Sequence, residues 1–518
     1  MKKLPIGIAS LKEIIQEDYL YVDKTNTALK LITEGKYYFL SRPRRFGKSL
    51  FLDTLKEIFQ GNKALFKGLY IEDKYDFVSY PVIRISFNSG DYKSLQSMQQ
   101  RMHEVLTLSQ NELGLTCKEG LSLGGCLEEL IYKAHKKYNQ RVVVLIDEYD
   151  KPILDNIENP EMAKIARDEL KSFYSVIKGA DEYLRFAFLT GVSKFSKVSL
   201  FSGLNNLNDI TLDENYATIC GYTQEDVETS FEEHLKGQDF DKIKEWYNGY
   251  QWLGKSVYNP FDILLFIQKG YVYENYWFST ATPTFLLKIL EQNNYFLPNL
   301  ENIVADSKLL DSFDVDYIKL ETLMWQTGYL TISKAWEGFD GMNYALSIPN
   351  KEVQISLMGS ISEYISNITN PKIIKNALYH TLATEDLSTL KSNLHALFAS
   401  IAYTHFTKTK LYEFEGYYVS VFYAYLKALG IPLVGEDVTN KGRIDLALFL
   451  PNALYIIEFK LDSDTALAQI KAKSYHEKYR DQNKPIYLVG ITFDSKERNV
   501  SKVEWERAGW NSNFYFFC

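Results

Sequence analysis

The chain has 518 residues, of which 46% are hydrophobic and 24% are charged, and its formal net charge is −8. This composition is typical of globular domains, and the length predicts two to four of them. The negative net charge argues against broad nonspecific binding of nucleic acid but leaves room for a local basic cleft. No stretch of about 18 apolar residues occurs, so no membrane span is expected.

The four cysteines are scattered along the chain and have no metal-ligand spacing; they are Cys117, Cys126, Cys220 and Cys518. This usage fits a reducing cytosol and no disulfide framework. The first ten residues, MKKLPIGIAS, lack the apolar run of a signal peptide. We therefore expect a cytoplasmic protein.

The first half of the chain alternates short apolar strands with helical patterns. Strands are expected at 37–41, 81–87, 141–150 and 183–192, and helices at 49–61, up to about 138, and at 161–180. Continuous apolar runs such as the third one are typical of strands buried on both faces of a parallel sheet. The order of elements predicts an α/β domain, with a parallel sheet covered by helices.

The middle of the chain, from about 270 to 375, is rich in aromatic residues and in helical patterns. Residues 318–333, then 343–353, then a further helix give the order helix, strand, turn, strand, helix. A winged-helix unit and a plain helical packing domain are the two alternatives. After about 378, helices precede a hairpin at 442–460, a helix at 465–481 and a strand at 485–494. The patterns divide the chain into regions 1–268, 269–377 and 378–518.

A phosphate-binding loop is predicted where the first strand ends, because residues 42–49 read RPRRFGKS and a helix follows at once. Backbone N–H groups in such a loop, and the helix N-terminus, point at phosphates. The residues that match the end of the P-loop motif are Gly47, Lys48 and Ser49. In that motif the lysine reaches the β- and γ-phosphates and the serine binds Mg²⁺. Arg42 replaces the first glycine, so an ordinary loop is the alternative. Arg44 and Arg45 can also contact phosphate.

An acidic strand end supports the nucleotide site, because residues 142–150 read VVVLIDEYD. Asp147 is expected to hold Mg²⁺ through water, and Glu148 to orient or activate the hydrolytic water. A structural strand that ends in acidic residues at a helix N-terminus is the alternative. The strand at 185–196 supplies Thr190 and Ser193, either of which can be the polar sensor of the γ-phosphate. Together the loop and the acidic strand predict ATP binding with Mg²⁺.

Three charges interrupt the apolar hairpin GRIDLALFLPNALYIIEFK, and they are Asp445, Glu458 and Lys460. Alternation along a strand puts Glu458 and Lys460 on one face. A two-residue loop puts Asp445 opposite Glu458, a four-residue loop puts it opposite Lys460, and a three-residue loop puts it on the other face. Two carboxylates this close favour a cation such as Mg²⁺ between them. A cross-strand ion pair is the alternative.

Four motifs together resemble the bacterial AAA-ATPase-like family. They are LPIGIASLKEIIQEDYLYVDKT at 4–25, RPRRFGKS at 42–49, LIDEYDKPI at 145–153 and FLTGVSKFS at 188–196. The resemblance runs through about residues 4–262 and resumes around 410–480. Members commonly carry a C-terminal PD-(D/E)XK nuclease-like domain, which implies a restriction-endonuclease-like α/β fold there. A missing first glycine is a feature of this family's loop.

The resemblance implies roles for the hairpin charges. In PD-(D/E)XK nucleases an Asp and a Glu-x-Lys build the metal site, and these are similar to Asp445, Glu458 and Lys460. A glutamate on a preceding helix often joins them; Glu415 fits, with Glu413 as the alternative. A glutamine on the following helix is typical, and Gln469 fits. Carboxylate-bound Mg²⁺ polarises the scissile phosphate and activates water. The lysine positions that water or stabilises developing charge.

The expected function is that of a hydrolase, an ATPase coupled to a Mg²⁺-dependent nuclease acting on DNA. Its catalytic residues are then Glu148, Asp445, Glu458, Lys460 and Gln469. A nucleotide-dependent regulatory or defence switch is the first alternative, with the nuclease-like domain as its effector. A binding module with a catalytically idle nuclease fold is the second. The sequence assigns no arginine finger and fixes no oligomeric state; a homo-oligomer is one option.

Overall fold

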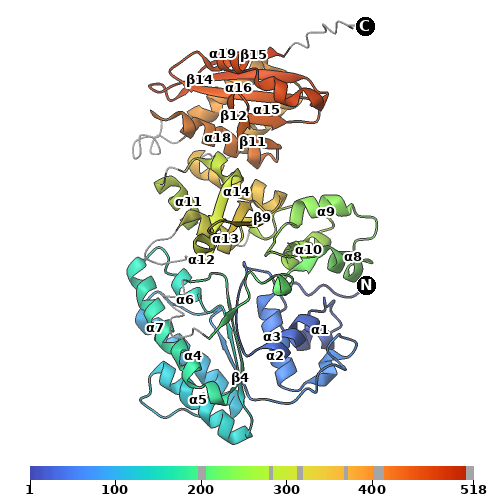
Figure 1. The fold of residues 1–518 in the computed structure, drawn as a ribbon, viewed down its shortest axis with the longest axis vertical. Helices are drawn as coiled ribbons and strands as arrows, with labels where there is room; N and C mark the ends of the chain where they lie inside the picture. The colour runs from blue at the N-terminus through green and yellow to red at the C-terminus, as the bar shows by residue number, and fades with distance from the viewer. Residues whose placement is uncertain are drawn as a thin grey trace. The chain divides into compact units, whose positions relative to one another are not determined.

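The structure is a computed structural model, and it describes residues 1–195, 206–278, 284–293, 295–311, 319–366, 371–401 and 413–508. The chain forms two compact units, the first from Met1–Ala281 and Val304–Asn350, the second from Thr282–Ile303 and Lys351–Cys518 (Figure 1). The region 269–377 is divided between the two units. The three-part division at 268 and 377 stays a prediction.

The first unit contains a five-stranded parallel sheet with the strand order β2-β3-β4-β1-β5. Its strands are β1 (Tyr37–Ser41), β2 (Val82–Ser86), β3 (Val142–Asp147), β4 (Leu184–Gly191) and β5 (Asn208–Asp209). The four predicted strands are confirmed, and β1 and β3 are buried along their whole length. The carboxyl ends of parallel strands share one edge of a sheet, where α/β folds bind their ligands.

Helices cover the sheet on both sides (Figure 1). On one side α4 (Leu95–Leu113), α5 (Leu123–Tyr138) and α7 (Pro160–Gly179) pack against one another, and the short α6 (Lys151–Leu154) packs on α7. On the other side α3 (Lys48–Phe59) packs against α1 (Leu11–Gln16) and α2 (Thr25–Glu34). Polar side chains at Ser94, Ser122 and Asn159 cap the three long helices at their N-termini. The predicted alternation of strands and helices is confirmed.

Short helices and two small sheets complete the first unit. It begins with β6 (Tyr222–Thr223), α8 (Gln224–Ser230), α9 (Phe240–Tyr247), β7 (Val257–Tyr258) and α10 (Pro260–Gln268). It ends with β8 (Ile303–Asp306), α12 (Ser307–Asp311), α13 (Leu320–Thr327), β9 (Thr331–Gly338) and β10 (Gly341–Ser347), whose strands form a sheet of order β8-β10-β9. The expected order helix, strand, turn, strand, helix is present, although residue 318 lies outside the described residues. The last helix, α14 (Lys351–Ser366), belongs to the second unit, where it packs on α18 (Glu415–Ala428).

The second unit is built around a mixed five-stranded sheet. Its strands are β11 (Leu433–Thr439), β12 (Gly442–Phe449), β13 (Leu454–Leu461), β14 (Ile486–Asp494) and β15 (Asn499–Arg507), in that order. Only β13 and β14 are parallel to each other. The helices are α11 (Thr284–Gln292), α14, α15 (Pro371–Ala383), α16 (Leu390–Ala399), α18 and α19 (Ala466–Lys473). The predicted hairpin and the strand after it are confirmed.

The helix expected at 465–481 is shorter than predicted. It ends at Lys473, because Ser474 adopts the left-handed conformation with φ 51°, and a 3₁₀ helix follows over Tyr475–Gln482. Tyr475 and Tyr479 are both buried in the hydrophobic core of this unit. The end of α19 at Lys473 therefore allows both tyrosines to pack into the core, and they do not form an exposed surface.

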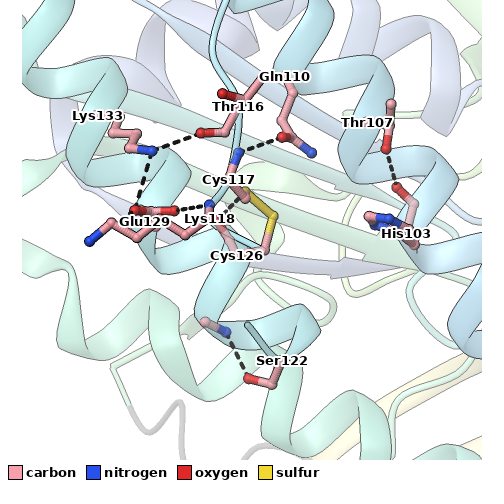
Figure 2. Close-up of a disulfide and its surroundings, with 11 residues drawn as sticks. His103, Thr107, Gln110, Thr116, Cys117, Lys118, Ser122, Cys126, Glu129 and Lys133 are labelled. Carbon is pink, nitrogen blue, oxygen red and sulfur yellow. Dashed lines mark hydrogen bonds and ion pairs between the residues drawn. A yellow bond between two sulfur atoms is a disulfide. The ribbon is translucent and has the colours of Figure 1, made fainter. Parts of the chain in front are cut away.

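A disulfide joins Cys117, in the connection after α4, to Cys126, in the first turn of α5 (Figure 2). Around it the backbone N–H of Cys117 donates to Gln110 Oε1 at 2.6 Å, and Lys133 Nζ donates to the carbonyl of Thr116 at 2.7 Å. The expectation of no disulfide is wrong for this pair, because the turn between the helices returns the chain to Cys117. Cys220 is a buried free cysteine, and Cys518 lies outside the described residues. In the described part of the chain, no helix combines the length and the apolar character that a membrane span needs.

The disulfide gives the first testable prediction. Replacing both Cys117 and Cys126 by serine should lower the free energy of unfolding by about 2–3 kcal/mol, because the cross-link restricts the unfolded chain. Urea unfolding of the oxidised protein, with and without reductant, measures the difference. The double variant is the control, since reductant should leave its unfolding curve unchanged. Peptide mapping that finds two free thiols at these positions would contradict the prediction.

Candidate functional sites

A cavity of about 450 Å³ opens at the carboxyl edge of the parallel sheet. Its polar lining residues include Arg44, Arg45, Lys48, Ser49, Glu148, Asp150 and Lys151. Its apolar lining residues include Ile8, Leu20, Val22, Phe261 and Leu264. Cavities of this size commonly hold small ligands and cofactors. The phosphate-binding residues predicted from the sequence therefore line a space large enough for a nucleotide.

The P-loop begins α3 as predicted. Gly47 precedes the helix with φ 90°, a conformation that glycine adopts without strain. Lys48 is buried, and its Nζ donates to the carbonyls of Arg42 and Pro43, both at 2.9 Å. Burial lowers the pKa of Lys48, and the nearby charge of Asp147 opposes that shift. The ammonium group is thus held by neutral carbonyls of its own loop, and a phosphate would offer it a charged partner.

Arg42, at the position of the missing glycine, does not line the cavity. Its guanidinium group is fully buried, donates to the carbonyl of Thr211 at 2.9 Å and lies 4.1 Å from the ring centroid of Trp252. Burial lowers its pKa to about 10, so it stays charged at neutral pH. The loop accommodates an arginine there because the side chain is buried against Thr211 and Trp252 and stays out of the cavity lining. Arg44 and Arg45 are exposed and line the cavity.

Asp147 ends β3 and Glu148 follows it, and the charges of both act on Lys48 of the P-loop. Asp147 is 1% exposed, and Glu148 follows in the left-handed conformation with φ 51°. Burial, and next the charge of Asp147, raise the pKa of Glu148. Asp150 was not predicted as a site residue; its carboxylate accepts from the backbone N–H groups of Val192 at 3.0 Å and Ser193 at 2.6 Å. Burial raises the pKa of Asp150 to about 6. Its signal in the sequence was the second aspartate of DEYD.

Strand β4 lies between β1 and β3, so Thr190 is positioned between the P-loop strand and the acidic strand. Thr190 Oγ1 and Ser193 Oγ are buried and have no hydrogen-bond partner among the described residues. A buried hydroxyl without a partner is costly, so a new acceptor close by would be favourable. Neither residue lines the cavity, and both alternatives for the sensor stay open.

In the second unit the hairpin register decides where the charges lie. Leu446 pairs with Ile457, and the N–H of Leu450 donates to the carbonyl of Ala453 at 2.9 Å. The connection is therefore the two-residue alternative, and the register continues to put Asp445 opposite Glu458. At that point the Asp445 side chain replaces the ladder bond, since its Oδ2 accepts from the N–H of Phe459 at 2.8 Å.

The structure gathers the predicted nuclease residues in one cluster. Glu458 is 1% exposed, and Gln469 Nε2 donates to its Oε1. Lys460 Nζ lies 3.4 Å from Glu458 Oε1 and 3.5 Å from Glu415 Oε1. Glu415 Oε2 accepts from the N–H of Leu461 at 3.2 Å. Residues from α18, β13 and α19 therefore meet around one lysine.

The electrostatics of this cluster suit a divalent cation. Burial raises the pKa of Asp445 and of Glu458, and for Glu458 the charge of Asp445 is the next cause. Burial opposes the charge on Lys460, but the carboxylates of Glu415, Glu458 and Asp445 outweigh it and raise its pKa. Glu458 Oε2 is buried and has no hydrogen-bond partner among the described residues. A bound Mg²⁺ would satisfy this oxygen and reduce the repulsion. Within the described ranges, no three His, Cys, Asp or Glu side chains are already spaced as a metal centre.

A glycine sets the position of Gln469. Gly490 on β14 is the parallel neighbour of Glu458. A Cβ atom at Gly490 would lie 2.5 Å from the backbone nitrogen of Leu467, in the first turns of α19. Only a glycine lets α19 approach the sheet this closely, and that approach brings Gln469 to the Glu458 carboxylate.

One further acidic residue near the cluster was not predicted. Glu436, on β11, has φ 56° and forms an ion pair with Arg443. Burial raises its pKa, and its charge contributes to the raised pKa of Asp445. Only the strand register places it near Asp445, because Gly435 pairs with Leu446. The sequence alone does not give that register.

Comparison with known proteins gives a family match over each of the two regions that contain these sites. Residues 5–201 match the family described as predicted AAA-ATPase, and residues 413–503 match the PD-(D/E)XK nuclease superfamily. A protein of Azotobacter chroococcum mcd 1, described as an uncharacterized protein in the vnfD 5′ region, is 47% identical over 508 residues. The match covers 96% of this chain and 98% of that protein.

Among solved structures, the Orc1 protein of Aeropyrum pernix in complex with DNA is similar at 11% identity, over 68% of this chain and 96% of that one. Its TM-score is 0.26, and a likeness this low carries no argument about the present chain. The fold and the matched families define a protein that joins an ATPase-like P-loop domain to a nuclease-like domain. The chain belongs to the AAA-ATPase-like family with a C-terminal PD-(D/E)XK nuclease-like domain.

The raised pKa values of Asp445 and Glu458 predict pH-dependent metal binding. A raised pKa means that these carboxyl groups hold protons which ordinary carboxyl groups have already lost, and a metal ligand must be deprotonated. The affinity for Mn²⁺ should therefore rise between about pH 5 and 8, with release of protons on binding. Calorimetry in two buffers of different ionisation enthalpy measures both effects. The Asp464→Asn variant, altered at an exposed carboxylate, should behave as wild type, whereas Glu458→Gln should lose most of the binding. Affinity that is independent of pH would contradict the prediction.

Proposed function

We propose that the protein is an ATP-binding protein and ATPase, coupled to a Mg²⁺-dependent nuclease domain that hydrolyses DNA phosphodiesters. One observation carries the proposal: Asp445, Glu458 and Lys460, on the hairpin strands β12 and β13, form one cluster with Glu415 of α18 and Gln469 of α19. A structural ion pair needs one carboxylate and one lysine. This cluster has more carboxylates than its lysine neutralises, and one oxygen of Glu458 is left without a hydrogen-bond partner among the described residues.

Each residue of the cluster has a role in phosphodiester hydrolysis. Asp445, Glu458 and Glu415 would hold Mg²⁺, which when bound polarises the phosphate and lowers the pKa of water. Lys460 keeps its proton because its pKa is raised, so it can stabilise negative charge on the phosphate or position the attacking water. Gln469 fixes the orientation of the Glu458 carboxylate by donating to Oε1.

The nucleotide site supports ATP binding in the same way. Lys48 would exchange two loop carbonyls for the β- and γ-phosphates, and Ser49 and Asp147 would hold Mg²⁺. Glu148 would orient the hydrolytic water, and its raised pKa brings it closer to the range of a general base. Thr190 is the proposed sensor, with Ser193 as the alternative. Arg44 and Arg45 line the same cavity and would contact phosphate oxygens.

The substrate is proposed to be DNA because the PD-(D/E)XK match is to nucleases. Basic side chains near α19 give little extra support, since carboxylates neutralise them. Lys471 lies 2.7 Å from Glu506, and Lys478 forms an ion pair with Asp437. A cytoplasmic location and a homo-oligomer stay predictions.

A regulatory or defence switch is the second candidate function, and one observation favours it. Lys460 forms ion pairs with Glu415 and Glu458, and Lys48 donates to two carbonyls of its own loop. A substrate that binds either lysine must first break these contacts. In such a switch the nuclease-like domain is an effector that stays idle until nucleotide or a partner acts.

The P-loop assignment predicts that Lys48→Ala abolishes ATP binding and hydrolysis. Among the described residues, Lys48 is the one buried lysine that lines the cavity. Equilibrium binding of a fluorescent ATP analogue and release of inorganic phosphate measure the two steps. Lys12→Ala, at an exposed lysine on α1, is the control. Unchanged affinity and turnover in Lys48→Ala would remove the basis for the assignment.

The nuclease assignment predicts that Asp445→Ala abolishes Mg²⁺- or Mn²⁺-dependent cleavage of DNA and leaves ATP hydrolysis largely unchanged. Supercoiled and linear DNA are incubated with metal, with and without ATP, and the products are separated on gels. Asp464→Ala, at an exposed carboxylate, is the matched control. Cleavage that survives in Asp445→Ala shows that the charged hairpin is structural. Absence of cleavage by the wild-type protein, with ATP still bound, favours the switch.

A further inference from the structure

Gln326, on α13, holds the chain that leaves β4. Its side chain is 5% exposed, and its Oε1 accepts from the N–H of Lys194 at 3.1 Å. Its Nε2 donates to the carbonyl of Lys194 at 3.1 Å and to that of Leu310 at 3.3 Å. One amide group therefore binds both polar backbone groups of Lys194. Two such bonds fix the position and the orientation of this backbone segment.

Lys194 directly follows the proposed sensor segment. The preceding residue, Ser193, donates its backbone N–H to Asp150, and Asp150 lines the nucleotide cavity. A movement of Ser193 or of Asp150 on nucleotide binding therefore displaces the backbone that Gln326 holds.

The C-terminal end of α13 contacts the P-loop itself. Gly328 ends the helix with φ 92°, and a Cβ atom there would lie 2.8 Å from Cβ of Pro43. Pro43 is one of the two residues whose carbonyls hold Lys48. The remaining space between Pro43, Lys194 and Gln326 is a cavity of about 10 Å³, room for about one water molecule. Close packing of this kind transmits a displacement without absorbing it.

The strands that follow α13 connect this contact to the chain that enters the second unit. Thr331, at the start of β9, accepts from the N–H of Gln251 at 2.8 Å through its Oγ1. Gly249 has φ 120°, and a Cβ atom there would lie 1.9 Å from the carbonyl oxygen of Pro349, so the two backbones are in close contact. Pro349 follows β10, and two residues later α14 begins.

We propose that nucleotide binding displaces α13 through its contacts with Lys194 and Pro43, and that this displacement reaches the start of α14. Gln326 is the positioning residue at the contact with Lys194. This inference rests on the proposed function, because it requires ATP in the cavity. ATP would draw Lys48 away from the carbonyl of Pro43, and the γ-phosphate would engage the sensor segment next to Lys194. Nucleotide shifts a conformational equilibrium only through contacts that differ between its two states. These two contacts join α13 to the P-loop and to the backbone next to the proposed sensor.

Two variants test the role of Gln326. Gln326→Glu keeps an acceptor for the N–H of Lys194 but turns an oxygen toward its carbonyl, and Gln326→Met keeps the approximate shape without hydrogen bonds. Gln96→Glu, at an exposed glutamine in the first turn of α4, is the matched control. Thermal unfolding first establishes that the variants are folded.

The main measurement is amide hydrogen exchange of a peptide covering residues 347–353, with and without ATP and Mg²⁺. In the wild type and in Gln96→Glu we expect ATP to change the exchange rate by about fivefold or more. In both Gln326 variants this change should disappear, while the dissociation constant for ATP stays within about twofold of wild type. The ratio of DNA cleavage with ATP to cleavage without ATP should approach one in the same variants.

The outcomes separate the inference from the proposed function. A wild-type protein that does not bind ATP overturns both. ATP binding with no change of exchange at 347–353 in the wild type overturns the inference alone. The inference also fails if the Gln326 variants keep the full ATP-dependent change of exchange at 347–353. It fails likewise if the loss of that change is explained by a weaker affinity of the variants for ATP.

Discussion

Buried negative charge is the constraint on which both sites depend. Carboxylates in the protein interior are costly unless they are paired and hydrogen-bonded. In the first unit Asp147, Glu148 and Asp150 lie around Lys48, and in the second Asp445 and Glu458 lie beside Lys460. Each lysine reduces the cost but does not remove it, as the raised pKa values of Glu148, Asp150, Asp445 and Glu458 show. Additional positive charge at either site would lower this cost further.

The sequence predicted those parts of the molecule that depend on local patterns. Strands β1, β3 and β4 are continuous apolar runs, so burial on both faces fixed their position. The P-loop and the hairpin charges were found because each motif lies between a strand and its turn or helix. The hairpin register was left with three alternatives, and it took the bond from Leu450 to Ala453 to select one.

The remaining features depend on contacts and backbone conformations that no sequence motif marks. Arg42 is buried against Thr211 and Trp252, which no local pattern connects to a P-loop. The pairing of Cys117 with Cys126 depends on the turn between two helices, and the early end of α19 depends on the conformation of Ser474. Such features are set by tertiary packing, so a single sequence gives no signal for them.

Gly490 shows that a site can depend on a residue that has no functional group. The motif residues of this unit can all be retained while a methyl group at position 490 lifts α19 away from the sheet, because its Cβ would lie 2.5 Å from a backbone nitrogen. Gln469 would then no longer reach Glu458. A relative that keeps every charged residue but has a side chain at position 490 would match the nuclease motif and lack the contact between the glutamine and the glutamate. Whether a relative can form this site is therefore better judged from position 490 together with the charged residues than from the charged residues alone.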